Sequence, residues 1–133
     1  MLFVYLLEAH PEYGQRTREI LTKMNTRRDR LCTSAFTLGE LLTGPRKRDA
    51  PDLAGRIRQA LKSPHVELLS FDSEAAETYS QIRAMNLVAP ADAIHLACAS
   101  RAGTDLFLTN DRRLHRIVVP GISFIVGLDA SVY

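Results

Sequence analysis

Three acidic residues carry the most chemical information in this sequence, because each stands where an apolar segment begins or ends. Glu40 lies in the apolar run 35–42, Asp92 follows a proline and an alanine, and Asp111 closes the run 106–110. Carboxylates that are brought close together repel and raise one another's pKa unless a cation neutralises them. Because oxygen ligands suit Mg²⁺ or Mn²⁺, these acids predict a divalent-cation site if the fold gathers them.

A metal ion held by carboxylates lowers the pKa of a bound water, orients that water and offsets charge on a leaving oxygen. No serine or cysteine stands in a setting that suggests a covalent nucleophile. Thr109 and Asn110 are candidates to hydrogen-bond a metal-bound water or a phosphate. His95 and His115 are expected to be satisfied by backbone or solvent rather than to bind metal.

Each acid also has a purely structural interpretation. Asp92 falls in the first turn of an expected helix, where the helix dipole favours a negative charge by about 0.3–1 kcal/mol. Asp111 suits a turn or a helix cap, and Glu40 suits the solvent-facing side of a helix. The three acids taken together are more specific than any one of them.

The elements that must position these acids alternate between helix and strand. Helices are expected over residues 12–28, 34–42, 53–61, from 72 or 73 onward, and 89–101, and strands over residues 31–34, 66–71, 106–109 and 123–126. Ser34 is expected to cap the second helix, and Gly44-Pro45 to end it. This alternation predicts a mostly parallel sheet in a three-layer α/β/α domain, with ligands at the carboxyl ends of its strands.

The composition is that of one soluble domain. The chain has 133 residues, 46% hydrophobic and 24% charged, and a net charge of only +2, which alone does not predict nucleic-acid binding. The apolar run 2–7 is too short to cross a bilayer and has no signal-peptide flanks, so a cytoplasmic protein is expected. Cys32 and Cys98 lie in apolar runs and are expected to be buried free thiols.

These motifs resemble the PIN-domain family of metal-dependent nucleases, and most closely its small VapC-like toxin ribonucleases. The resemblance rests on Glu40 in its helix, Pro-Ala-Asp at residues 90–92 and Thr-Asn-Asp at residues 109–111, which occur in the family's order. It extends over nearly the whole chain, because residues 3–8, followed by His10-Pro11, are similar to the family's first helix.

The resemblance implies a metal-dependent endoribonuclease in which Glu40, Asp92 and Asp111 bind Mg²⁺ or Mn²⁺ and cleavage leaves a 5′ phosphate and a 3′ hydroxyl. It also implies a homodimer and an antitoxin whose C-terminal segment covers the acidic pocket. Because backbone charge dominates affinity for nucleic acids, basic residues near these motifs are candidates for RNA phosphate contacts. These are Arg46, Lys47, Arg112 and Arg113.

The resemblance leaves out one feature of the family, a first strand that ends in an aspartate. Met1 falls just past the place of that aspartate, so a metal ligand and a central strand are expected to be missing. One interpretation is that the start is misplaced or that upstream residues are lost. A second is that residues 2–7 form a strand and Glu8 replaces the aspartate. A third interpretation is a degenerate PIN-like protein that binds RNA or a partner without cleaving.

Other acid-using α/β classes fit less well. A phosphatase with an aspartate nucleophile would need Asp-x-Asp after its first strand, and no Asp-x-Asp occurs in the chain. A receiver domain would need a lysine late in the chain, whereas the last lysine is Lys62. A catalytically inactive PIN-like binding module therefore remains the main alternative to the nuclease.

Overall fold

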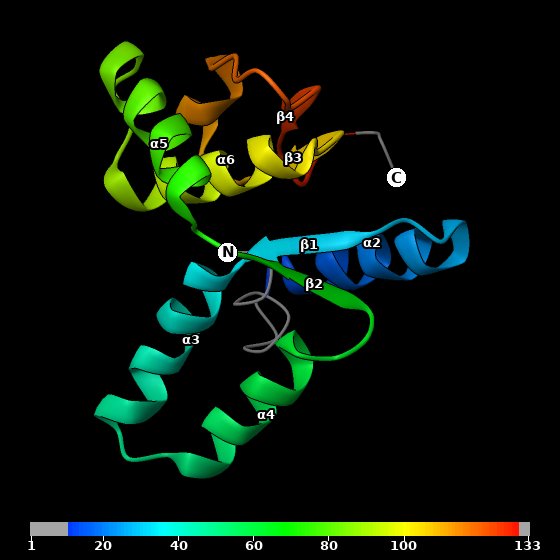
Figure 1. Ribbon diagram of the computed structural model, residues 1–133. Helices are drawn as coiled ribbons and strands as arrows, with labels where there is room; N and C mark the ends of the chain where they lie inside the picture. The colour runs from blue at the N-terminus through cyan, green and yellow to red at the C-terminus, as the bar shows by residue number, and fades with distance from the viewer. Residues whose placement is uncertain (1–10, 131–133) are drawn as a thin grey trace.

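The computed structural model describes residues 11–130, in which helices alternate with short strands (Figure 1). The elements are α2 (Gly14–Arg27), β1 (Leu31–Ser34), α3 (Ala35–Lys47), α4 (Pro51–Leu61), β2 (Val66–Leu69), α5 (Ser73–Met85), α6 (Pro90–Ala102), β3 (Leu106–Leu108), the 3-10 helix η1 (Arg112–Arg116) and β4 (Phe124–Val126). The α/β class predicted from the sequence is confirmed. The helix expected at residues 3–8 and the alternative strand at residues 2–7 lie outside the described residues.

Strand pairing in the described part of the chain is parallel throughout and is confined to two pairs. β1 lies beside β2, with Leu31 opposite Val66. β3 lies beside β4, with Leu106 opposite Phe124. The parallel arrangement agrees with the prediction, but residues 11–130 form two two-stranded sheets rather than one continuous sheet.

β1 and β3 are less buried than the sequence predicted. Both were expected to be buried strands, yet all of β3 and the first three residues of β1 are only half-buried. The reason is that both strands line one groove, so one side of each remains open. Figure 1 shows the two strand pairs as separate ribbons.

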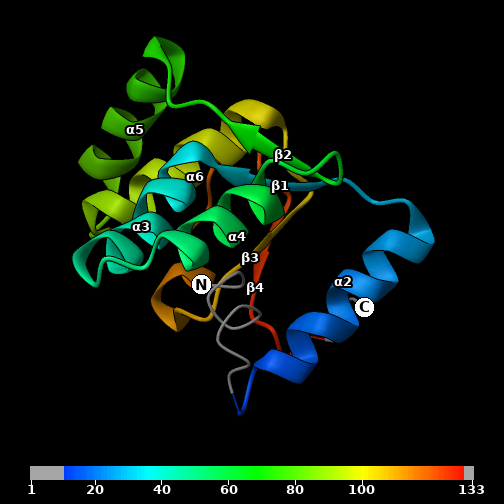
Figure 2. The same cartoon turned by 90° about the horizontal axis from the view of Figure 1, so that it is seen from below.

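Helix α2 packs against a strand of each pair. Its buried Ile20 and Met24 form a cluster with Leu128, against which Leu31 of β1 and Leu108 of β3 pack. Figure 2 shows α2 on one side of β3 and β4 and α6 on the other, which is the layered arrangement expected of an α/β/α domain.

Two further apolar clusters fix the remaining helices. Leu96 of α6 packs with Ile82 of α5 and with Val119, and this cluster lies against β3 and β4. Ile57 and Leu61 of α4 form the other cluster, which packs against α3, β1 and β2. The helix that carries Asp92 and the helix that carries Glu40 thus belong to different clusters.

The ends of α5 and α6 follow the signals read from the sequence. Asp72 caps α5 by accepting a hydrogen bond from the Ala75 N–H at 2.9 Å. Pro90 opens α6, and Gly103, at φ 68°, ends it in the left-handed conformation that glycine adopts without strain. Most other predicted boundaries differ from the observed ones by one or two residues.

The prediction that Gly44-Pro45 ends the helix of Glu40 was wrong, because α3 continues to Lys47. A proline inside a helix removes its own N–H bond to the preceding turn, but its fixed φ is helical and the following residues can still donate. The Arg48 N–H donates to the Gly44 carbonyl at 3.1 Å, which keeps the last turn closed.

Both cysteines lie within the described residues. Cys32 and Cys98 are both free thiols; Cys98 is buried as expected, whereas Cys32 is half-buried. Among residues 11–130, no helix has the length and apolar character needed to cross a bilayer.

Candidate active site

The candidate site lies in the groove between β1 and β3, which has a volume of about 580 Å³. The groove is lined by both strands, by Glu40 of α3 and by Asp92 and His95 of α6. Asp111 follows β3 by three residues, at the carboxyl end of the strand. The three acids predicted from the sequence therefore come from different elements to one end of the molecule, where parallel sheets place their sites.

Asp92 is half-buried in the first turn of α6 and carries a charge that its surroundings disfavour. Burial raises the pKa of Asp92 above its ordinary value, and the neighbouring charges of Asp111 and Glu40 add to this effect. His95 and Arg113 oppose the shift without cancelling it. Because a cation beside Asp92 would relieve this cost, its surroundings suit a metal ligand.

Asp111 has the opposite environment. It is the N-cap of η1, and its Oδ1 accepts hydrogen bonds from the backbone N–H and the Nε of Arg113, each at 3.0 Å. Its Oδ2 accepts from the Nη2 of Arg113 at 2.8 Å. Hydrogen bonding from the Arg113 side chain is the main reason that the pKa of Asp111 lies below its ordinary value. The capping interpretation of Asp111 is thus realised, together with a bidentate ion pair.

Glu40 extends from α3 toward α6, where it meets His95. The Nε2 of His95 lies 2.9 Å from Oε1 of Glu40, and its Nδ1 lies 2.7 Å from Oγ of Ser34. This arrangement was not predicted from the sequence. Backbone or solvent was expected to satisfy His95, whereas the ring contacts two side chains. Ser34 was expected to cap α3, whereas α3 has no side-chain cap bond.

The signal that could have identified His95 is its spacing. It lies three residues after Asp92 on α6, so both side chains lie on the same helix face. His115 follows the expectation, because its Nε2 lies 3.1 Å from the backbone oxygen of Thr109. The Thr109 hydroxyl accepts from the Asp111 N–H at 3.1 Å, so Thr109 shapes the loop that carries Asp111. Asn110 lies between these two residues.

The residues present fit a divalent cation in the chemistry of their donors and in charge. Asp92, Asp111 and Glu40 supply the hard oxygen ligands that Mg²⁺ and Mn²⁺ prefer, and Asp92 has an unrelieved charge. Within residues 11–130, however, no three His, Cys, Asp or Glu side chains are already grouped closely enough to hold an ion. The ligand assignment therefore remains a prediction, and it requires Asp111 to leave Arg113.

The predicted phosphate contacts fall into two places. Arg112 and Arg113 are exposed on η1, beside Asp111. Arg46 and Lys47 are exposed in the last turn of α3, six and seven residues beyond Glu40. Arg46 lines a smaller hollow of about 230 Å³ between α3 and α4. Only Arg112 and Arg113 lie directly beside one of the acids.

Comparison with known proteins places this fold in a family. The sequence model of the PIN domain matches residues 2–119. The chain is also similar to a solved structure described as VapBC2 from Rickettsia felis bound to a DNA fragment from their promoter, with a TM-score of 0.70 at 18% identity, covering 95% of this chain and 92% of that one. No curated protein sequence matches it. Because the PIN model covers most of the chain, this protein belongs to the PIN-domain family.

Proposed function

We propose that this PIN-domain protein is a metal-dependent endoribonuclease, the toxin of a toxin–antitoxin pair. The observation that carries the proposal is the position of Asp92, whose charge is disfavoured by burial and by Asp111 at the end of the groove. A group in this state is stabilised by a divalent cation, and carboxylates that bind such cations are the usual apparatus for phosphodiester hydrolysis.

The cation would be held by Glu40, Asp92 and Asp111, and either Mg²⁺ or Mn²⁺ suits these ligands. When bound, it supplies a water of lowered pKa and stabilises charge on the scissile phosphate. The residues of the chain itself would bind and orient the RNA. Arg112 and Arg113 contact the RNA backbone beside the acids, with Arg46 and Lys47 farther along α3. Thr109 shapes the Asp111 loop through its hydrogen bond to the Asp111 N–H. Asn110 is a candidate to hydrogen-bond a metal-bound water or a phosphate.

We further propose that an antitoxin protein binds this chain. The similar structure is described as a VapBC2 complex, which supports an antitoxin as a partner of this chain. We propose a homodimer and a cytoplasmic location for the same toxin, in keeping with the VapC-like resemblance of its motifs.

One observation favours the alternative, a catalytically inactive PIN-like module that binds RNA or protein. Both oxygens of Asp111 are bound by Arg113. If this pair persists in solution, Asp111 cannot bind a metal. The inactive module would bind RNA with an affinity that does not depend on metal.

Cleavage of a mixed RNA substrate with and without Mn²⁺ tests the proposal, with the wild type beside Asp92→Asn. Metal-dependent cutting that is lost in Asp92→Asn is the expected result. Cutting that persists in the variant would contradict the active-site assignment. The absence of cutting by the wild type, together with metal-independent RNA binding, would favour the inactive module.

A further inference from the structure

We propose that His95 is a positioning residue that, with Ser34 behind it, holds the carboxylate of Glu40 at the mouth of the groove. This inference rests on the proposed function, because it concerns the ligand set for the divalent cation. Two successive hydrogen bonds link Ser34 of β1 to His95 of α6 and His95 to Glu40 of α3, and so connect elements that belong to different apolar clusters.

The chain is anchored at its buried end. Ser34 is 3% exposed, and its Oγ lies 2.7 Å from the Nδ1 of His95. The His95 side chain is 22% exposed, and the Glu40 side chain is 48% exposed. The buried Ser34 therefore restrains the mostly buried His95 ring, and the ring restrains the exposed carboxylate of Glu40.

The chemistry of the partners fixes the direction of the chain. A carboxylate can only accept, so Nε2 of His95 must be the nitrogen that carries a proton toward Glu40. In a neutral imidazole the other nitrogen is then an acceptor, and the Ser34 hydroxyl donates to it. The structure therefore assigns the Nε2–H tautomer to neutral His95.

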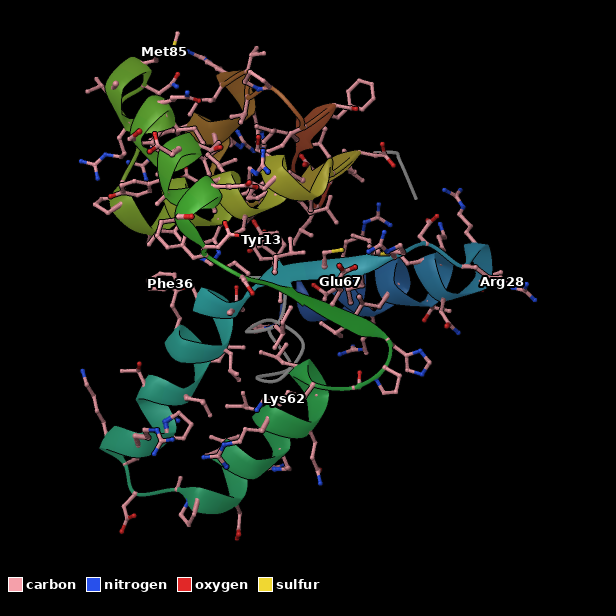
Figure 3. The ribbon with its side chains drawn as sticks, viewed as in Figure 1. Tyr13, Arg28, Phe36, Lys62, Glu67 and Met85 are labelled. Carbon is pink, nitrogen blue, oxygen red and sulfur yellow. The ribbon has the colours of Figure 1, made fainter. Side chains whose placement is uncertain are left out.

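Neighbouring side chains restrict the ring further. Phe36 of α3 lies against His95 with ring centroids 5.5 Å apart and planes tilted by 55°. Figure 3 shows Phe36 at the start of α3. Thr33 of β1, next to Ser34, and Thr37 of α3 are hydrogen-bonded through their hydroxyls, which lie 2.8 Å apart. This bond joins β1 to α3. The ring is therefore held between an aromatic neighbour and a hydrogen-bonded strand end.

This restriction matters because Glu40 is otherwise an exposed glutamate on a helix. Ordering a free glutamate side chain costs rotamer entropy, which a metal ion would have to offset. His95 orders the carboxylate beforehand. Residues that orient metal ligands in this way typically affect metal affinity by about 10–100-fold when they are mutated.

Mn²⁺ binding by calorimetry tests the inference with a set of variants. His95→Phe keeps a ring beside Phe36 and removes both hydrogen bonds; we expect its Mn²⁺ affinity to fall by about 10–100-fold. Ser34→Ala removes only the bond to Nδ1, so a smaller loss is expected. His65→Phe, at the exposed turn before β2, is the matched control and should bind Mn²⁺ as the wild type does.

A double-mutant cycle separates positioning from a general structural role. If His95 acts through Glu40, then His95→Phe should cause no further loss of Mn²⁺ affinity in a Glu40→Gln background. Equal losses in both backgrounds would overturn the inference. Wild-type affinity in His95→Phe, with a loss in Glu40→Gln, would also overturn it.

Nitrogen NMR of the wild-type protein gives a readout that needs neither a variant nor activity. We expect the Nε2–H tautomer for neutral His95 in the wild type, and a mixture of the two tautomers in Ser34→Ala. An Nδ1–H tautomer in the wild type would contradict it. Failure of the proposed function is distinguishable, because it would appear as Mn²⁺ binding unaffected by Asp92→Asn, whatever the state of His95.

Discussion

Arg113 binds Asp111 through both carboxylate oxygens, with its Nε 3.0 Å from Oδ1 and its Nη2 2.8 Å from Oδ2. The pair is local, because the two residues are separated by one position at the start of η1. The guanidinium also lies close enough to Asp92 to stabilise its charge. The Arg113 guanidinium thus stabilises the charges of two carboxylates that would bind the metal ion.

We predict that Arg113→Gln binds Mn²⁺ more tightly than the wild type. A divalent cation must displace the guanidinium from Asp111, and the variant removes this competitor. The same variant should bind RNA more weakly and lower the salt slope by about 0.7, as expected for one lost contact to a single strand. Calorimetry and salt-dependent RNA binding measure the two effects.

Arg18→Gln, an exposed arginine on α2, is the control for lost net charge in this comparison. If Arg18→Gln and Arg113→Gln changed Mn²⁺ affinity equally, the effect would be one of overall charge. A weaker affinity for Mn²⁺ in Arg113→Gln would show that Arg113 supports the metal site rather than competing with the ion.

The pKa values of the two aspartates are predicted to lie on opposite sides of the ordinary value of about 3.9. The pKa of Asp111 is lowered, chiefly by hydrogen bonding from Arg113, and that of Asp92 is raised, chiefly by burial. Carboxyl carbon NMR should therefore show Asp111 titrating first on raising the pH. In Arg113→Gln the difference between the two pKa values should become smaller or change sign, because Asp111 loses the main cause of its lowered pKa.

The same shifts fix the signs of two contributions to stability. The contribution of Asp111 is present above its unfolded pKa and is lost as the pH falls through its folded pKa. That of Asp92 is present below its unfolded pKa and is lost as the pH rises through its folded pKa. At neutral pH, Asp92→Asn should thus unfold at the same temperature as the wild type or higher. A clearly lower Tm would mean that the Asp92 carboxylate stabilises the fold.

The sequence predicted the elements of this fold better than the contacts between them. Pro90, Gly103 and Asp72 act within a single turn, so their effects on helix ends can be read locally. His95 could not be assigned its partners, because Ser34 and Glu40 reach it only after α3, α6 and β1 have packed. The three acids could be proposed because Asp92 and Asp111 stand at a helix start and a strand end and Glu40 stands in a motif similar to the family's, whereas their hydrogen-bond partners depend on the tertiary structure.

Metal binding should stabilise the wild-type protein and not Asp92→Asn. A ligand present at about 100 times its Kd raises the free energy of unfolding by about 2.7 kcal/mol. Thermal melts with Mn²⁺, and again after addition of a chelator, measure this shift. Equal stabilisation of the wild type and Asp92→Asn would place the binding outside the groove.

We expect the groove between β1 and β3 to accept an added strand. Within residues 11–130, each of these strands is paired on one side only, and both line the groove, so a third parallel strand could pair with both and join the two sheets. A strand that precedes α2 would reach β1 through a helix, which is the usual connection between parallel strands. Its carboxyl end would then lie near Asp92 and Asp111.

We therefore predict that a six-residue apolar strand ending in aspartate, added at the amino end of the chain, raises both the Tm and the Mn²⁺ affinity. The same strand ending in asparagine should raise the Tm alone, because pairing depends on the backbone and metal binding on the carboxylate. A version with a central proline, which cannot donate to the strand ladder, is the control and should raise neither. An unchanged Tm with the aspartate strand would mean that the groove does not accept a strand.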